Sequence, residues 1–276
     1  MSHNNQKKIA VINDLSGFGR CSLAVALPII SHLGIQCCPL PTAVFSNHTG
    51  FPSFYYTDCT HQMAPYMEEW KKLDLEFEGI LTGFLGSAQQ IDLVEQFLRE
   101  FTTQRTRVII DPVMGDNGRP YPTYTQELCQ QMKRLVRYAH ILTPNVTEAC
   151  ILTDTPYQEK FSEQALLKMA RQLCNQGPEQ VVITGVSRGE FLENYCYDQA
   201  TGPAVQRTRR VAPQRSGTGD VFASIVAAGA VQQVPFAKSV RTAAKFIKIC
   251  LNRSAELDIP TTDGVCFEEV LGKLHF

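Results

Sequence analysis

The sequence lacks the features that mark membrane, secreted and nucleic-acid-binding proteins. No apolar stretch reaches the ~20 residues that a membrane-spanning helix needs. Residues 1–8 are polar and lead directly into a strand-like run, which is unlike a secretory signal peptide. The net charge is −1 and no basic block occurs, so we expect no nucleic-acid partner, no membrane partner and a cytoplasmic location.

Two common nucleotide-binding fingerprints are also missing. The chain has no Gly-x-x-x-x-Gly-Lys-Ser/Thr sequence, so it is not a P-loop enzyme. Gly17 and Gly19 lack the third glycine of a dinucleotide fingerprint, and no acid follows them at about 20 residues. We therefore do not expect NAD as a cofactor.

The 10 cysteines include no C-x-x-C pair and are scattered, mostly among apolar neighbours. Such a pattern is typical of reduced, buried cysteine in a cytosolic protein. It does not indicate a disulfide framework or a zinc site.

Strand-like and helix-like segments alternate along most of the chain, which is 44% hydrophobic and 19% charged, as a globular protein is. Buried-strand patterns occur at residues 8–13, 35–40, 79–83, 108–111, 141–143 and 181–185. Helical spacing occurs at residues 21–33, 65–73, 89–101, 128–138, 161–174 and 237–251. An antiparallel pair is expected at 190–197 and 205–211. We therefore predict an α/β fold in which residues 1–276 form one domain, with a mainly parallel central sheet and helices on both faces.

A glycine turn at residues 216–220 (Ser-Gly-Thr-Gly-Asp) leads into an apolar run of helical length at 221–231. Glycines allow a tight turn, and the first N–H groups of a helix have no intrahelical partner, so this junction is suited to an anion such as phosphate. A carboxylate there would repel phosphate unless it has another task, such as accepting the proton of an attacking hydroxyl. Alternatively, Asp220 is only a favourable acid in the first turn of a buried helix.

Polar residues also stand near predicted strand ends. Asp111 closes a strand at the edge where open α/β sheets bind ligands, although a lone aspartate there often only caps a loop. Asn145 and Glu148 have the spacing of a capping box, which by itself would account for both. His48 lies in a polar loop surrounded by aromatics. Such a loop suits a flat polar ligand, or is a surface loop whose aromatics turn inward.

Four separated motifs together resemble one family. Gly217-Thr-Gly-Asp220 resembles the anion-hole signature of the ribokinase superfamily. Asp111-Pro-Val-Met-Gly-Asp116 and Thr143-Pro-Asn-Val-Thr-Glu148 resemble the metal and ATP motifs of its vitamin-kinase branch. Phe45-Ser-Asn-His-Thr-Gly50 is similar to the substrate loop of pyridoxal kinases. The resemblance extends over roughly residues 8–252, and the four motifs in this order are strongly specific.

This resemblance implies a ribokinase-like three-layer α/β/α fold and a transferase of vitamin B6 salvage. The implied reaction is ATP-dependent phosphorylation of the 5′-hydroxymethyl group of a B6 vitamer (pyridoxal, pyridoxine or pyridoxamine), which gives the 5′-phosphate. The resemblance also implies Mg²⁺, allows for a monovalent cation, and favours a homodimer.

The resemblance further assigns roles to individual residues. Asp220 would be the base, and the transferring phosphoryl group would be held by the amides of Gly217, Thr218 and Gly219. ATP would be bound by Asp111, Asn145, Thr184, Thr218 and Gly219. Mg²⁺ would be held by Asp111, Asp116 and Glu148. The substrate would be bound by Asp14, Asn47, His48, Thr49, Phe84 and Asp220.

Some positions depart from the pyridoxal kinase pattern and leave the substrate open. Gly83-Phe84 stands where many pyridoxal kinases have Gly-Tyr, and residues 14–19 look more like the glycine loop of hydroxymethylpyrimidine kinases. Those kinases, however, usually carry cysteine where this chain has Asp220. The alternatives are a hydroxymethylpyrimidine kinase of thiamine synthesis, an enzyme that serves both substrates, or a non-catalytic vitamin-binding regulator on a kinase fold.

Overall fold

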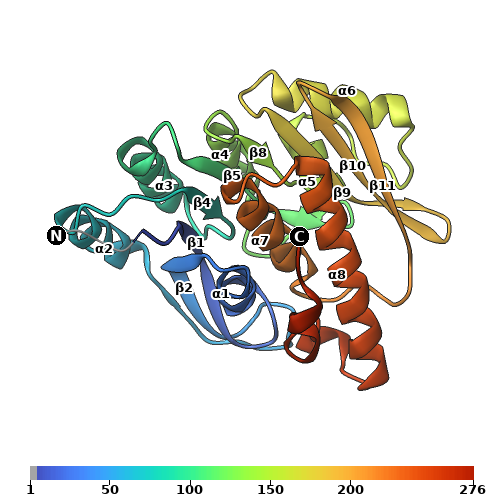
Figure 1. Ribbon diagram of the computed structural model, residues 1–276, viewed down its shortest axis with the longest axis horizontal. Helices are drawn as coiled ribbons and strands as arrows, with labels where there is room; N and C mark the ends of the chain where they lie inside the picture. Colours follow the sequence, from blue (N-terminus) through green and yellow to red (C-terminus); the bar gives the residue numbers. More distant parts are fainter. Residues whose placement is uncertain (1–4) are drawn as a thin grey trace.

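A nine-stranded sheet forms the centre of the structure, a computed structural model that describes residues 5–276 (Figure 1). The strand order is β11-β10-β9-β8-β5-β4-β1-β2-β3. The strands are β1 Lys8–Phe18, β2 Gln36–Asn47, β3 Tyr56–Asp58, β4 Gly79–Thr82, β5 Arg107–Ile110, β8 Ile141–Leu142, β9 Gln180–Arg188, β10 Phe191–Asp198 and β11 Gly202–Arg209. All neighbours from β2 to β9 pair in parallel, while β3, β10 and β11 pair antiparallel at the two edges. A separate hairpin consists of β6 Gly115–Asp116 and β7 Arg119–Pro120.

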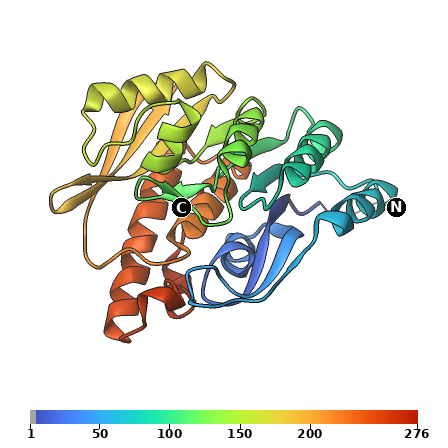
Figure 2. The same ribbon diagram turned by 180° about the vertical axis from the view of Figure 1, so that it is seen from behind.

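Two layers of helices cover the sheet, and Figures 1 and 2 show them from opposite sides. One layer contains α2 Thr60–Lys72, α3 Ala88–Phe101, α4 Gln126–Val136, α5 Val146–Leu152 and α6 Glu163–Cys174. The other contains α1 Ser22–His32, α7 Thr218–Val231 and α8 Phe236–Glu256, followed by the short 3-10 helices η1 Thr261–Asp263 and η2 Glu268–Lys273. Each layer buries its own apolar core against one face of the sheet, which confirms the predicted α/β/α arrangement.

The first strand shows why the sequence favours a central position in the sheet. Ile9 and Val11 point into the core beneath α1 and α7, whereas Ala10 and Ile12 point into the core beneath α2 and α3. Successive side chains on a strand face opposite sides, so a continuous apolar run can satisfy two cores only when helices cover both faces. The side chains of all four residues are completely buried.

The structure extends the first two strands well beyond their predicted ends. Residues 14–20 were expected to form a glycine loop, but β1 continues to Phe18 and pairs with β2, with Ser16 opposite Phe45. A register shift at Asn13–Leu15 bends β1 where it leaves the core. Loop-like composition did not reveal this pairing because the partner strand lies some 30 residues further along the chain. As a result, His48 is carried at the tip of a two-stranded extension.

Other local expectations are confirmed. The antiparallel excursion lies at β10 and β11, and the capping box at Asn145 is present, with Glu148 closing it. All 10 cysteines are free. Within residues 5–276, none of the helices combines the length and the apolar character needed to cross a bilayer.

Gly217 is the N-cap of α7 and has a left-handed backbone, with φ of +82°. A Cβ atom at this position would lie 1.9 Å from the carbonyl oxygen of Arg20. A Cβ at Gly219, by contrast, would meet no atom within 4 Å. The turn therefore requires glycine at 217 to bring α7 against the loop before α1, whereas at Gly219 the fold leaves open space.

We predict that Gly217→Ala lowers the free energy of unfolding by roughly 2 kcal/mol or more, because it adds both a left-handed strain and a backbone clash. The matched variant Gly219→Ala should stay within about 0.5 kcal/mol of the parent protein. Urea unfolding followed by circular dichroism measures both. Equal destabilisation by the two variants would contradict this view of the turn.

Candidate active site

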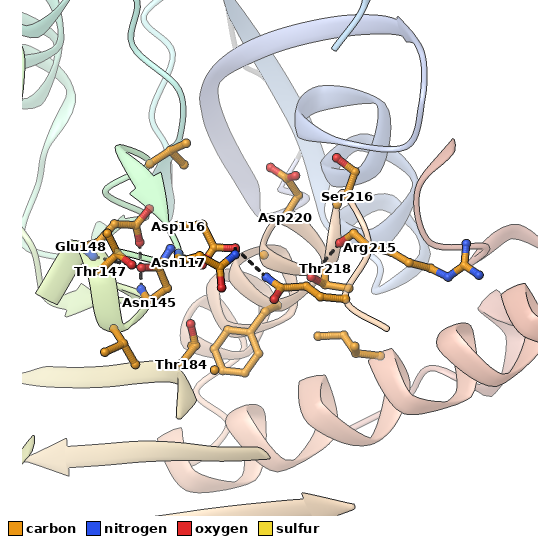
Figure 3. Close-up of a pocket in the computed structure, with 18 of the residues that line it drawn as sticks. Asp116, Asn117, Asn145, Thr147, Glu148, Thr184, Arg215, Ser216, Thr218 and Asp220 are labelled. Carbon is orange, nitrogen blue, oxygen red and sulfur yellow. Dashed lines mark hydrogen bonds between the residues drawn. The ribbon is translucent and has the colours of Figure 1, made fainter. Parts of the chain in front are cut away.

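A cleft of about 970 Å³ follows the carboxyl ends of the parallel strands. Every site residue predicted from the sequence lines this cleft except Asn47. Its lining includes the glycine turn and Asp220 on one side and Asn145, Thr147 and Glu148 on the other (Figure 3). The sheet topology therefore gathers residues as far apart in the sequence as Asn13 and Asp220, which are separated by 207 positions.

The glycine turn presents unpaired N–H groups to the cleft. The first helical hydrogen bond of α7 runs from the Val221 amide to the Gly217 carbonyl, at 2.9 Å. The amides of Thr218 and Gly219 have no acceptor among the described residues. They lie at the positive end of a 14-residue helix, so the turn is suited to an anionic group.

Asp220 follows these amides and lines the same cleft. Loss of hydration raises its pKa to about 6, opposed by the Ser22 backbone N–H, which donates to the carboxylate, and assisted by the negative charge of Asp14. At neutral pH the carboxylate is therefore ionised but more basic than a solvated aspartate. That combination suits a general base.

Asn13 is a site residue that the sequence analysis missed. Its Oδ1 accepts hydrogen bonds from the amides of Asp14 at 3.0 Å and Phe84 at 2.8 Å, and its Nδ2 is 3.4 Å from Asp220 Oδ1. Both backbone partners are donors, so the amide orientation is fixed and the NH₂ group faces the carboxylate. A Cβ at Gly83 would lie 2.4 Å from this amide, so Gly83 makes room for it. No local pattern links Asn13 to Asp220.

Asp14 is buried beside Asp220, and two hydroxyl groups donate hydrogen bonds to its carboxylate. Ser22 Oγ donates to Oδ1 at 2.6 Å and Ser16 Oγ donates to Oδ2 at 3.2 Å. Burial raises the pKa of Asp14, and the two hydroxyl donors oppose that rise. Asp14 lines the cleft, but much of its hydrogen-bonding capacity is taken up by Ser16 of β1 and Ser22 of α1.

On the opposite wall, Glu148 is both the capping-box residue and a cleft residue. Its Oε2 accepts from the Asn145 amide at 2.8 Å and its Oε1 accepts from the Met114 amide at 3.1 Å. Asn145 in turn donates from Nδ2 to the Gly115 carbonyl at 2.8 Å. The simple capping explanation is therefore correct for both residues, and both also face the cleft.

Among the described residues, no cationic side chain pairs with the acids Asp111 and Glu148. Loss of hydration raises the pKa of Asp111 to about 8, against a hydrogen bond from Thr143 and with help from the charge of Asp220. Burial and the charge of Asp111 raise the pKa of Glu148 well above its ordinary value. A cation between them would relieve both effects.

This donor set fits Mg²⁺, a hard cation that takes one or two carboxylates and completes its shell with water and phosphate oxygens. Within the residues that the structure describes, no three acidic, histidine or cysteine side chains come close enough to hold a metal ion alone. Asp116, the third predicted ligand, accepts from the Asn117 amide at 2.8 Å and from Gln214 Nε2 at 3.0 Å. It thereby ties the β6–β7 hairpin to the segment before the glycine turn (Figure 3).

The predicted substrate residues have distinct surroundings. Phe84 packs edge-on against Phe45 and Tyr124 in the wall of the cleft, with ring centroids 6.0 Å apart in both pairs. Thr49 also lines the cleft. Asn47 instead donates from Nδ2 to the Ser53 carbonyl at 2.8 Å and lies outside the lining.

His48 and Thr184 are held by backbone groups. His48 uses both ring nitrogens on main-chain partners, Gly50 and Thr262. Thr184 lies midway along β9, where it forms a parallel bridge with Asn145, its Oγ1 is 3.4 Å from the Pro144 carbonyl, and it faces the cleft (Figure 3).

Comparisons relate the chain to vitamin kinases. The family described as phosphomethylpyrimidine kinase matches residues 31–263. A protein from Bacteroides thetaiotaomicron, provisionally described as a phosphomethylpyrimidine kinase, is 37% identical, with a TM-score of 0.96 over 99% of this chain and 96% of that one. Another crystal form of that protein was determined with pyridoxal.

Two further relatives carry different descriptions. Pyridoxal kinase from Lactobacillus plantarum is 26% identical, with a TM-score of 0.89 over 97% of this chain and 96% of that one. Hydroxymethylpyrimidine/phosphomethylpyrimidine kinase from Haemophilus influenzae is 29% identical over 66% of this chain and 67% of its own length. Because the family match covers most of the sequence, the chain belongs to the phosphomethylpyrimidine kinase family of the ribokinase superfamily, as its motifs predicted.

Proposed function

We propose that this kinase transfers the γ-phosphoryl group of ATP to the 5′-hydroxymethyl group of a B6 vitamer. The observation that carries the proposal is the position of Asp220. A carboxylate with its pKa raised to about 6 directly follows a turn whose amides have no protein acceptor among the described residues. An alcohol beside Asp220 could lose its proton while the neighbouring amides hold the phosphoryl group that it attacks.

In the proposed reaction, Asp220 accepts the hydroxyl proton as the substrate oxygen forms a bond to the γ-phosphorus. The bond from that phosphorus to the bridging oxygen breaks, and ADP leaves with the electron pair. The amides of Thr218 and Gly219 stabilise the charge on the transferring group, and each such donor can contribute roughly 3–4 kcal/mol. Asn13 keeps Asp220 oriented through the hydrogen bond from Nδ2.

We place Mg²⁺ on the opposite wall, where Asp111 and Glu148 would hold it and Asp116 would assist. When bound, the ion would neutralise phosphate charge. Asn145, the N-cap of α5, and Thr184, midway along β9, would contact the nucleotide phosphates. The raised pKa values of Asp111 and Glu148 support this assignment, since both acids favour a nearby cation.

The B6 vitamer is favoured over hydroxymethylpyrimidine by Asp220 itself and by the substrate loop. The Bacteroides relative crystallised with pyridoxal is 36% identical, which also supports this choice. The alternative is favoured by the description of the matching family and by the Haemophilus relative. A non-catalytic regulator is disfavoured because the acids and the glycine turn line one cleft.

Parallel turnover measurements on pyridoxal, pyridoxine, pyridoxamine and hydroxymethylpyrimidine test the substrate. We expect kcat/KM for at least one B6 vitamer to exceed that for hydroxymethylpyrimidine by ~10-fold or more. The aromatic wall at Phe84 gives no reason to reject either ring, so this margin rests on the substrate loop. A clear preference for the pyrimidine would replace the proposed substrate and leave the phosphotransfer intact.

Replacement of Asp220 by asparagine should lower kcat by ~10²-fold or more while ATP binding changes little, because only the proton acceptor is lost. In the parent enzyme, kcat/KM should fall as pH drops through about 6, since protonated Asp220 cannot accept a proton. Initial rates from pH 5 to 9, with nucleotide binding measured by calorimetry, check both expectations.

Asn13→Asp provides the matched control for this assignment. It keeps the acceptor for Phe84 and Asp14 but turns a carboxylate toward Asp220, so the acidic limb of the pH profile should move upward by about one unit or more. An unchanged limb would mean that another group controls the profile.

We also propose that the protein is a homodimer, as pyridoxal kinases commonly are. The edge of the sheet at β3 supports this, because Tyr55 is 74% exposed and Tyr56 50% exposed beside a strand with a free side. We expect sedimentation velocity to give about twice the mass of one chain. A monomer at micromolar concentration would refute the proposal.

A further inference from the structure

Arg215 is a buried cation in an unusual setting, directly before the glycine turn. Its side chain is only 8% exposed, and in the described part of the chain no carboxylate pairs with it. Its Nη1 donates to the carbonyls of Ile259 at 2.6 Å and Pro260 at 2.9 Å, while Nε has no partner there. Figure 3 shows the guanidinium turned away from Asp220. Burying a charge without an ionic partner is costly, so these two carbonyls are its principal compensation.

The carbonyls belong to a short segment between α8 and η2, residues 259–265, which we call the C-terminal strap. The strap meets the glycine turn a second time, where the Val265 amide donates to the Ser216 carbonyl at 3.2 Å. It also accepts from Arg20, whose backbone amide and Nη1 lie 3.3 and 3.1 Å from the Asp263 carbonyl. Because Gly217 rests on the Arg20 carbonyl, the turn is enclosed on both sides.

The same strap holds the substrate loop through His48. The Gly50 amide donates to Nδ1 at 3.1 Å, so Nε2 carries the proton and donates to the Thr262 carbonyl at 2.7 Å. The ring is packed closely, since a Cβ at Gly19 would lie 2.4 Å from it and the tilted ring of Phe51 has its centroid 4.7 Å away. His48 is thus fixed by the protein backbone and has no free ring nitrogen for a ligand.

We propose that the C-terminal strap sets the position of the substrate loop relative to the glycine turn, with His48 and Arg215 as its positioning residues. Four carbonyls of the strap reach Arg215 before the turn (259 and 260), the loop (262) and Arg20 (263). Pro260 and the 3-10 turn η1 stiffen the segment, so a shift at one end is passed to the other. This inference rests on the proposed function, because the loop would carry the vitamer and the turn the phosphoryl group.

The first test measures the protection of the backbone amides, independently of activity. In Arg215→Met, hydrogen–deuterium exchange should rise in residues 46–52, which Arg215 does not contact. In His48→Leu, exchange should rise in residues 216–220. His48→Gln, whose amide can replace the Nε2 donor, should restore protection. Changes confined to the mutated end would overturn the coupling.

The second test measures kcat and KM with the substrate that the parent enzyme turns over. Arg215→Met and His48→Leu should each lower kcat by ~10-fold or more, as expected for small misplacements of reacting groups, with KM for ATP within about three-fold. The double variant should be little worse than the poorer single variant, because either change releases the strap. Multiplicative losses would overturn the proposal.

Controls separate the possible failures. Glu269→Gln removes a surface ion pair between Glu269 of η2 and Arg253 of α8. It should leave both the hydrogen exchange and kcat unchanged. If Arg215→Met does not fold, Arg215→Lys keeps the charge with a shorter reach and should show a smaller rise in exchange at residues 46–52. If the parent protein phosphorylates none of the vitamin alcohols, the proposed function fails, while the exchange experiment still decides the role of the strap.

Discussion

The close approach of Gly217 to the Arg20 carbonyl is the constraint on which the site depends. A glycine in the left-handed region lets α7 begin against the loop before α1, where a side chain of any size would separate them. The approach brings the start of α7 beside the end of the first core strand. Asp220 thereby meets the Ser22 amide and the Asn13 side chain, which hold its carboxylate. Without this contact Asp220 would have a position on the helix but its carboxylate would have no defined direction.

Electrostatics divides the cleft into two walls with different roles. Burial raises the pKa values of four acids that line it, Asp14, Asp111, Glu148 and Asp220. A polyphosphate would be repelled by such a site unless positive charge were supplied. The unpaired amides at the start of α7 supply it on one wall, and the acids on the other wall favour a bound cation. Burial, assisted by the negative charge of Asp14, accounts for the raised basicity of Asp220, and the Ser22 amide and Asn13 hold its carboxylate in position.

Several residues serve the fold and the site together, so a structural explanation did not exclude a functional one. Asn145 and Glu148 close a capping box that local spacing predicted, yet the same groups face the cleft. His48 follows the opposite course. The motif suggested a ligand contact, but both of its ring nitrogens bond to main-chain groups. Asn47 turns to Ser53 for a similar reason, because a tight loop uses its polar side chains to satisfy its own backbone.

The sequence by itself determined the parts that depend on near neighbours. Buried strands, the glycine turn and the capping box follow from periodicity, φ preferences and short-range hydrogen bonds, which any segment carries with it. The tertiary structure alone decided which of these parts meet. The bond from Asn13 to Asp220 joins positions 207 residues apart, and that from His48 to Thr262 joins positions 214 apart. Strand order and helix packing set such contacts, and no local pattern of side chains encodes them, so the orientation of the Asp220 carboxylate and the anchoring of the loop at residues 45–50 emerged only in the folded chain.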